Sequence, residues 1–268
     1  MYIPSYLKLA AILLGFITTI NYQAKAQTKK ENQLGPLSSL NLGIRYSSIY
    51  ENRGLVLYDG YQIDPVIGVF LFNDRLEFLG DSIGYRDFIY TDQIRLRTRL
   101  QSITDNPLFP EVDSKKRFDR EDSFEWQNKI EFFTPGYNDD YISEFDLGFA
   151  KDLSAHNGLY LDFTSKLKLF DFTIDKLKVL IEPNLFFTLG YGDENHNRYF
   201  YGPQATDAGL NNLSYGIWFS FPKEADRNYP IIQIKHFQVL GKQRAQSDYA
   251  KDNSSGWMIS FIATGGIL

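Results

Sequence analysis

The chain has 268 residues, with 28 lysines and arginines against 33 acidic residues and a formal net charge of −5. This mildly acidic balance argues against a nucleic-acid-binding protein, which needs a basic stripe. The complete absence of cysteine excludes disulfides, thiolate metal sites and a lipid anchor on cysteine. The mean hydropathy of −0.31 argues against a bundle of membrane helices but allows a transmembrane β-barrel, in which only alternate residues face lipid.

Residues 1–26 have the layout of a cleaved export signal. The amino terminus and one lysine are followed by an apolar run over 9–20 and by an Ala-Lys-Ala pattern that ends at Ala26. The alternative is a membrane-spanning helix, but the run has about 12 residues against the roughly 20 that a span needs. We therefore predict cleavage after Ala26 and a polar periplasmic lead-in over 27–38.

From residue 39 onward, apolar and polar residues alternate in long segments. In 124–133, Trp126 and Ile130 share one face while charged side chains share the other, and such a period of two predicts β-strands. The segments are 40–50, 61–72, 75–86, 93–101, 124–133, 141–150, 159–169, 177–189, 213–221, 230–240 and 257–263. Most are longer than the usual globular strand of about 5–6 residues and suit the roughly 9–11 residues that cross a bilayer at a tilt.

Loop lengths favour a closed transmembrane barrel over a soluble sandwich. Counted back from the C-terminus, the three longest gaps, 102–123, 191–212 and 241–254, fall on the same side of the sheet, as the outer loops of outer-membrane barrels do. An even strand count requires one more strand, and 54–58 (GLVLY) is the candidate. We predict an all-β fold over 39–268, a transmembrane antiparallel up-and-down β-barrel of about 12 strands within a range of roughly 10–14.

If the apolar faces meet lipid, the polar faces must fill the lumen, because a lysine or arginine at the lipid midplane costs roughly 2–4 kcal/mol. The predicted lumen charge network consists of Arg95, Arg97, Arg99, Glu125, Lys129, Glu131, Glu144, Asp146, Asp162 and Lys166. Both signs of charge alternate between neighbouring strands. Two interpretations follow: a salt-bridged interior that fills a narrow barrel, or an ion-selecting pore lined by the arginines.

The sequence offers few candidates for catalytic residues. The histidines are His156, His196 and His236, and none shows metal-ligand spacing such as HExxH. His236 could meet Ser220 on the preceding strand, as in barrel hydrolases, but no further pattern marks that pair. Asp193, Glu194 and Asp207 could hold calcium or be solvated loop acids. We predict a non-enzymatic protein with no catalytic residues, no bound metal and no cofactor.

An aromatic-rich segment resembles a known family. Asn197-Arg198-Tyr199-Phe200-Tyr201-Gly202 follows a strand that contains Ile181-Glu182-Pro183, and Asp207-Ala208-Gly209-Leu210 comes next. These motifs resemble the MltA-interacting protein (MipA)/OmpV family of outer-membrane proteins, in which an Asn-x-Tyr-[Tyr/Phe]-[Tyr/Phe]-Gly segment follows a strand opening with Leu-x-Pro. The resemblance covers most of 40–265 and is specific across 181–221.

The resemblance implies a barrel without catalytic residues in the cell outer membrane of a Gram-negative envelope. One family member is a scaffold that brings together a murein-degrading transglycosylase and a murein synthase, so partners of this kind, besides outer-membrane lipid, are expected here. The alternative function is a small pore or transporter for ions or small solutes. The family-like loop motif is Asn197, Tyr199, Phe200, Tyr201 and Gly202. We expect it either to contact a partner or ligand from an outer loop, or to fold against the barrel rim through its aromatic rings.

Overall fold

The structure is a computed structural model. It describes residues 37–72, 74–89, 93–103, 109–110, 115–116, 120–135, 141–174, 179–221, 230–247, 249–250 and 254–266. The predicted export signal at 1–26 lies outside the described residues, as does most of the predicted lead-in. Among the residues described, no helix is both long enough and apolar enough to cross a membrane.

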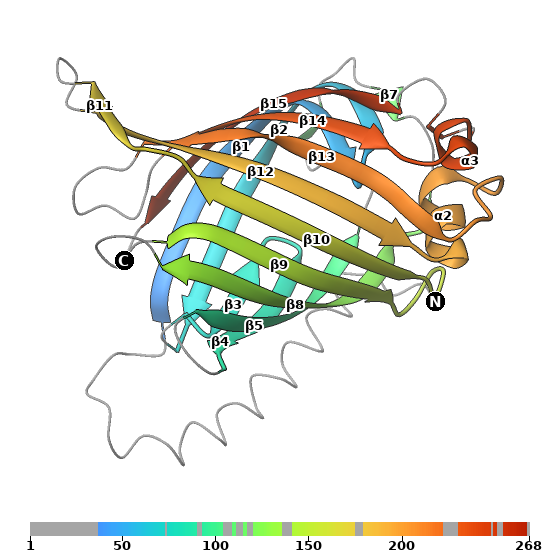
Figure 1. Ribbon diagram of the computed structural model, residues 1–268. Coiled ribbons are helices and arrows are strands. Elements are labelled where there is room, and N and C mark those ends of the chain that lie inside the picture. Colours follow the sequence, from blue (N-terminus) through green and yellow to red (C-terminus); the bar gives the residue numbers. More distant parts are fainter. Residues whose placement is uncertain are drawn as a thin grey trace, which may run out of the picture.

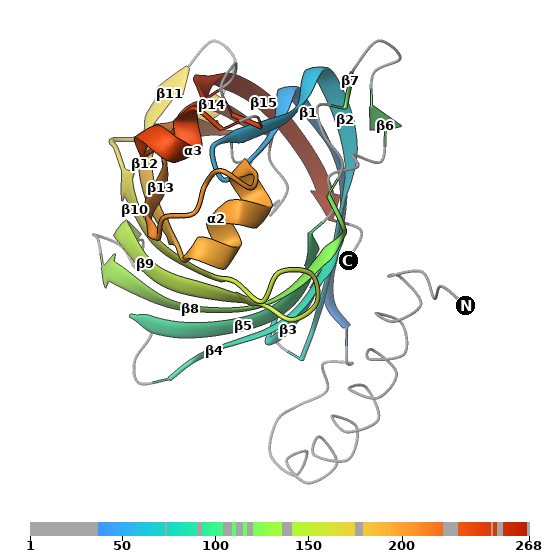
Figure 2. The ribbon, with the colours of Figure 1, turned by 90° about the vertical axis from the view of Figure 1, so that its right-hand side faces the viewer.

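Twelve strands form one closed antiparallel barrel (Figures 1 and 2). They are β1 (Leu37–Asn52), β2 (Leu55–Leu71), β3 (Leu76–Leu79), β4 (Ser82–Phe88), β5 (Ile94–Ile103), β8 (Ser123–Pro135), β9 (Tyr141–Asp152), β10 (Leu159–Lys168), β12 (Val179–Gly192), β13 (Gly209–Ser220), β14 (Ile231–Val239) and β15 (Ser255–Gly266). Each strand pairs with the next, and β1 pairs with both β2 and β15, which closes the sheet. The predicted fold class and the strand count of 12 are confirmed.

Shorter elements decorate the barrel. The strands β6 (Phe109–Pro110) and β7 (Lys115–Lys116) pair with β2, and β11 (Phe172–Ile174) pairs with β12. Two helices, α2 (Glu194–Tyr201) and α3 (Lys242–Ala245), follow β12 and β14. Because β3 pairs with β2 only over 68–71, β6 and β7 supply partners farther along β2, at 58–59 and 62–63.

The twelfth strand is not the one that the sequence suggested. The segment 54–58 does not form a separate strand. Gly54 belongs to the two-residue turn Arg53-Gly54, which joins β1 directly to β2, and β2 begins at Leu55. Both turn residues have positive φ, 51° and 81°, which is the geometry of a tight hairpin turn.

The additional strand comes from 75–86, which we had expected to be a single strand. A turn at Gly80-Asp81 splits it into β3 and β4, and Gly80 has a φ of 57°. Phe78 and Ile83 lie opposite each other across this hairpin and so share a face of the sheet. The outward positions therefore change from even to odd numbers at the turn, which explains why the alternation over 75–86 has no clean phase.

Apolar side chains cover the outside of the barrel and charged side chains fill the inside, as the alternation predicted. Leu147 is 53% exposed whereas its neighbour Asp146 is 2% exposed, and Trp126 is 43% exposed whereas its neighbour Glu125 is fully buried. This contrast is the reverse of a soluble protein, in which apolar residues are buried and charges are exposed. A closed barrel with this distribution fits an outer-membrane barrel protein in general.

The longest connections meet at one end of the barrel, as their parity predicted. Figure 1 shows α2 and α3 at the same end. The Tyr199 hydroxyl, in the connection after β12, donates to the backbone oxygen of Glu121, in the connection before β8. The described parts of the long connections therefore contact one another at the barrel mouth.

Candidate functional site

The arginines of β5 form the first half of an ion-pair ladder in the lumen. Arg97 lies between two carboxylates, with its Nε 3.3 Å from Glu77 Oε1 and its Nη1 3.2 Å from Glu131 Oε1. Arg95 also pairs with Glu131, and Arg99 Nη2 lies 2.8 Å from Glu77 Oε1. Glu77, on β3, is a member of this ladder that the sequence did not single out, because 75–86 gave no clear face.

Lysines on β8 and β10 form the second half. Lys129 Nζ lies 3.6 Å from Asp146 Oδ2 and 3.3 Å from Asp162 Oδ2. Lys166 Nζ lies 3.3 Å from Asp146 Oδ2 and also pairs with Glu144. Every residue of the predicted lumen charge network makes an ion pair. Within the two halves of the ladder the pairs join adjacent strands or strands one apart, whereas Glu125 pairs with a residue from the mouth.

That residue is Arg53, from the turn between β1 and β2. Its guanidinium binds Glu125 through two parallel hydrogen bonds, Nη1 to Oε1 at 2.7 Å and Nη2 to Oε2 at 2.6 Å. The same guanidinium lies over the rings of Tyr160 (4.1 Å) and Phe200 (4.7 Å). A forked, ring-stacked geometry of this kind suits arginine and not lysine. The pair fastens the hairpin tip to the barrel wall.

Helix α2 lies inside the mouth of the barrel. Figure 2, which looks in from the end that carries α2, shows the helix within the ring of strands. Asp193 caps its first turn by accepting hydrogen bonds from the backbone N–H of His196 (2.8 Å) and of Leu159 on β10 (2.9 Å). A side chain that caps a helix N-terminus satisfies an otherwise unpaired donor, and here the same carboxylate also ties the helix to the wall.

The family-like loop motif forms the buried face of α2. Asn197, Phe200 and Tyr201 are fully buried, and Gly202 ends the helix with a φ of 103°. Asn197 Nδ2 donates to the carbonyl oxygens of Gly192 (3.1 Å) and Asp207 (2.7 Å). The side chains of Asn197, Phe200 and Tyr201 therefore point inward and hold the connection together, whereas Tyr199 is half-buried and contacts the connection before β8.

The hairpin tip and α2 share an apolar core in the mouth. Leu55 and Leu57 from β2 pack with Phe200, Tyr201 and Val239. The Tyr201 hydroxyl donates to the carbonyl oxygen of Arg53 at 2.8 Å. Register shifts in the β1–β2 pairing near the tip mark bulges of the type that bend a hairpin. The plug thus consists of α2 and the inward-bent tip, residues 53–57.

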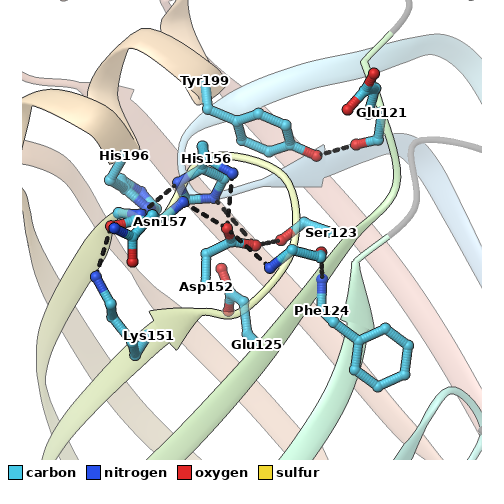
Figure 3. A network of polar contacts seen from close by, with 12 residues as sticks. Glu121, Ser123, Phe124, Glu125, Lys151, Asp152, His156, Asn157, His196 and Tyr199 are labelled. Atoms are coloured by element: carbon cyan, nitrogen blue, oxygen red, sulfur yellow. Dashed lines mark hydrogen bonds and ion pairs between the residues drawn. The ribbon is translucent and has the colours of Figure 1, made fainter.

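Two histidines meet where α2 packs against the turn between β9 and β10 (Figure 3). His156, from the turn between β9 and β10, and His196, from α2, have ring centroids 5.7 Å apart. His156 stacks on Tyr199 at 4.2 Å and His196 stacks on Phe200 at 4.4 Å. The sequence showed no relation between them, because they lie on separate connections whose approach depends on the closed barrel.

The surroundings of both histidines favour the neutral form of the ring. Burial lowers the pKa of His196 well below its usual value, and the positive charge of Arg53 lowers it further. Burial also lowers the pKa of His156, although Asp152 and Glu125 partly oppose that shift. Neutral imidazole rings stack in an aromatic core without the cost of a buried charge.

One potential metal-ligand atom from each of Glu125, His156 and His196 lies within 4.8 Å of the other two, but the hydrogen bonds of these residues do not suit a metal ion. His156 Nδ1 accepts a hydrogen bond from the Gly158 N–H at 3.0 Å. Nε2 of the neutral ring therefore carries the proton and has no lone pair for a metal. Both oxygens of Glu125 already bind Arg53, which would also repel a cation. The cluster is better suited to hydrogen bonding than to metal binding.

Two combinations of serine and histidine do not form the hydrolytic sites that their residue types suggest. The Ser123 hydroxyl donates to Asp152 and not to a histidine, so Ser123, Asp152 and His156 lack the order of a hydrolytic triad. Ser220 lies opposite Ile231 whereas His236 lies opposite Tyr215, and this register separates the pair that the sequence raised.

The acids of the 191–212 connection do not converge on a calcium site. Asp193 caps α2, as described, and Glu194 pairs with Arg198 at 2.7 Å. Asp207 pairs instead with Arg244 of α3 at 2.8 Å. Each carboxylate therefore has its own partner within the connections.

Comparison with known proteins adds no assignment. No protein-family model matches the chain, and no curated protein matches it significantly.

Removing Arg53 should strongly destabilise the plug, because it leaves Glu125 charged and buried without its partner. We expect Arg53→Met to cost about 3–5 kcal/mol, and Arg53→Met with Glu125→Gln to recover most of that loss. The measurement is urea-induced unfolding of the protein in detergent micelles. Arg198→Met, which breaks the exposed pair with Glu194, serves as the control and should cost less than about 1 kcal/mol. A double variant no more stable than Arg53→Met would contradict the assigned role of the pair.

Stability should fall below pH 6.5 because the buried histidines resist protonation. Their folded-state pKa values lie below the ordinary histidine value of 6.5, so the unfolded chain binds more protons as the pH falls through 6.5 and stability is lost. For each such histidine the loss approaches about 1.4 kcal/mol per pH unit. We expect His196→Phe to lose less stability than the wild type between pH 7.5 and pH 5.5 in the same unfolding assay. Identical losses in both proteins would show that His196 does not titrate in this way.

Proposed function

We propose that this protein is an outer-membrane β-barrel without enzymatic activity, which scaffolds murein-processing enzymes or otherwise supports the envelope. The observation that carries the proposal is the closed barrel whose apolar side chains face outward while its charges pair inside. Such an exterior is stable only against lipid. The export signal expected at 1–26 supplies the route to that membrane.

A non-enzymatic role is supported by how the polar residues of the mouth are used. Asp152 accepts hydrogen bonds from the backbone N–H groups of His156 and Asn157, both at 2.7 Å, and thereby shapes a turn. Arg53 and Glu125 satisfy each other. A catalytic site needs a nucleophile and a base aligned toward a substrate position, and these groups are aligned toward one another.

The scaffold role comes from the resemblance to the MipA/OmpV family across 181–221. The matching segment builds α2 and its supports, and α2 carries exposed charges such as Glu194 and Arg198 on its outward side. A rigid, plugged barrel offers fixed surfaces at both ends to proteins of the envelope. A murein transglycosylase and a murein synthase are the partners that the resemblance suggests.

A small pore is the competing function, and the lumen arginines are the observation that favours it. Arg95, Arg97 and Arg99 lie on one strand and face the lumen. Conduction would require α2 and the hairpin tip to leave the mouth, which breaks the buried Arg53–Glu125 pair. Paired charges and a fastened plug therefore support the scaffold over the pore.

Location and partners can be tested together. We expect the protein in the outer-membrane fraction of cells, folded in a form that unfolds only on heating in detergent. Chemical crosslinking in intact envelopes should then recover a murein transglycosylase or synthase, whereas an unrelated barrel of similar size, crosslinked in parallel, should not. Recovery of the chain in the soluble periplasm would reject the barrel location. A normal osmotic response in a deletion strain, together with no murein enzyme in the crosslinked material, would reject the scaffold.

Conductance separates the scaffold from the pore. In planar lipid bilayers the wild-type protein should give no channel steps, because the plug fills the mouth. A variant in which a Gly-Ser linker replaces 194–201 should conduct. Regular steps from the wild type would instead assign the pore function, and the absence of steps from both proteins would show that other parts of the lumen also block ions.

A further inference from the structure

A small cavity lies in the lumen below the plug. It has a volume of ≈ 120 Å³ and does not coincide with the histidine cluster. Its charged lining comprises Arg53, Arg97, Arg99, Lys129 and Asp162. The wall of the cavity therefore carries four cationic side chains and one carboxylate. This excess of positive charge differs from the ion-pair ladder, in which cations and carboxylates pair with each other.

The imbalance arises because the partner carboxylates lie behind the cations. Side chains of Arg97, Arg99 and Lys129 are 24%, 19% and 29% exposed. Glu77 and Glu131, which pair with the arginines, are each 1% exposed. The groups that can reach a molecule in the cavity are therefore positive, and the groups that neutralise them are covered.

The carboxylates do not satisfy every donor of the arginines. Nε of Arg97 makes only the ion-pair contact with Glu77 Oε1 at 3.3 Å, and Nε of Arg99 makes no hydrogen bond among the described residues. Both Nε atoms are covered, so the exposed fraction of each side chain lies on its other atoms. The lone carboxylate, Asp162, is already engaged by Lys129 at 3.3 Å.

We propose that this cavity binds a small oxyanion, such as phosphate, sulfate or a carboxylate. Guanidinium groups recognise such anions through paired, charge-assisted hydrogen bonds. Lys129 adds a further positive charge to the wall. Tyr160, whose hydroxyl donates to Asn212 Oδ1 at 3.1 Å, closes the wall beside Arg53. Inside a barrel of low dielectric these contacts are stronger than they would be at a surface. The site is present whether the barrel serves as a scaffold or as a pore.

Inorganic phosphate is the first probe. The purified, folded protein in detergent micelles is titrated with phosphate, sulfate and acetate in separate calorimetric experiments. We expect saturable binding of at least one of them in the millimolar range or tighter. A preference for phosphate and sulfate assigns a tetrahedral oxyanion, and a preference for acetate assigns a carboxylate.

Matched variants place the binding in the cavity. Arg99→Gln should weaken the preferred anion about tenfold, the loss that follows removal of a charge-assisted hydrogen bond. Arg45→Gln removes the same charge from a lumen pair with Asp64 that does not line the cavity, and should leave the affinity within about twofold. If Arg99→Gln does not fold, Lys129→Gln takes its place with the same expectation.

The proposal is overturned if none of the three anions binds the wild type saturably. It is also overturned if Arg45→Gln weakens binding as much as Arg99→Gln does, because the effect would then come from the net charge of the lumen and not from the cavity.

Discussion

In a closed antiparallel sheet, consecutive side chains point to opposite faces, so each apolar residue on the exterior commits its neighbours to the lumen. Leu147 and Asp146 illustrate the constraint, one exposed outside and the other buried inside. A charge placed in that interior must be paired, because an isolated buried carboxylate would be too costly. The ion-pair ladder from Glu77 to Lys166 follows from this requirement. An exterior suited to lipid and an interior filled by salt bridges are two results of one geometric rule.

Local patterns were sufficient for most of the strands and for the faces that those strands present. The period of two over 124–133 correctly separated Trp126 from Glu125, because burial on one face alone determines that pattern. The hairpins near the N-terminus were assigned wrongly at two points. The Gly80-Asp81 turn reverses the phase within 75–86, and residues 54–57 are all buried in the mouth, without alternation. Both cases depend on tertiary packing that a local window does not contain.

The mouth was the least predictable part, for the same reason. His156 and His196 meet only because β9, β10 and α2 are brought together by the closed sheet. Arg53 is a single charged residue before a glycine. No neighbouring residue in the chain indicates that its side chain turns inward and pairs with Glu125. The sequence did mark the segment around Asn197 and Tyr201 through its density of aromatic residues. It could not show that this segment enters the barrel, because the direction of a loop depends on the contacts that receive it.

The plug joins parts of the chain that are far apart, and this separation has a consequence for assembly. The hydrogen bond from Tyr201 to Arg53 connects residues 148 positions apart, and the Arg53–Glu125 bonds connect residues 72 positions apart. Contacts of such long range carry a loop-closure cost in entropy and slow folding. The wall closes through contacts that are longer still, because Ser47 on β1 and Ser260 on β15 lie 213 positions apart. Completion of the wall and completion of the plug therefore both depend on nearly the whole chain, and neither can be built from one half of it alone.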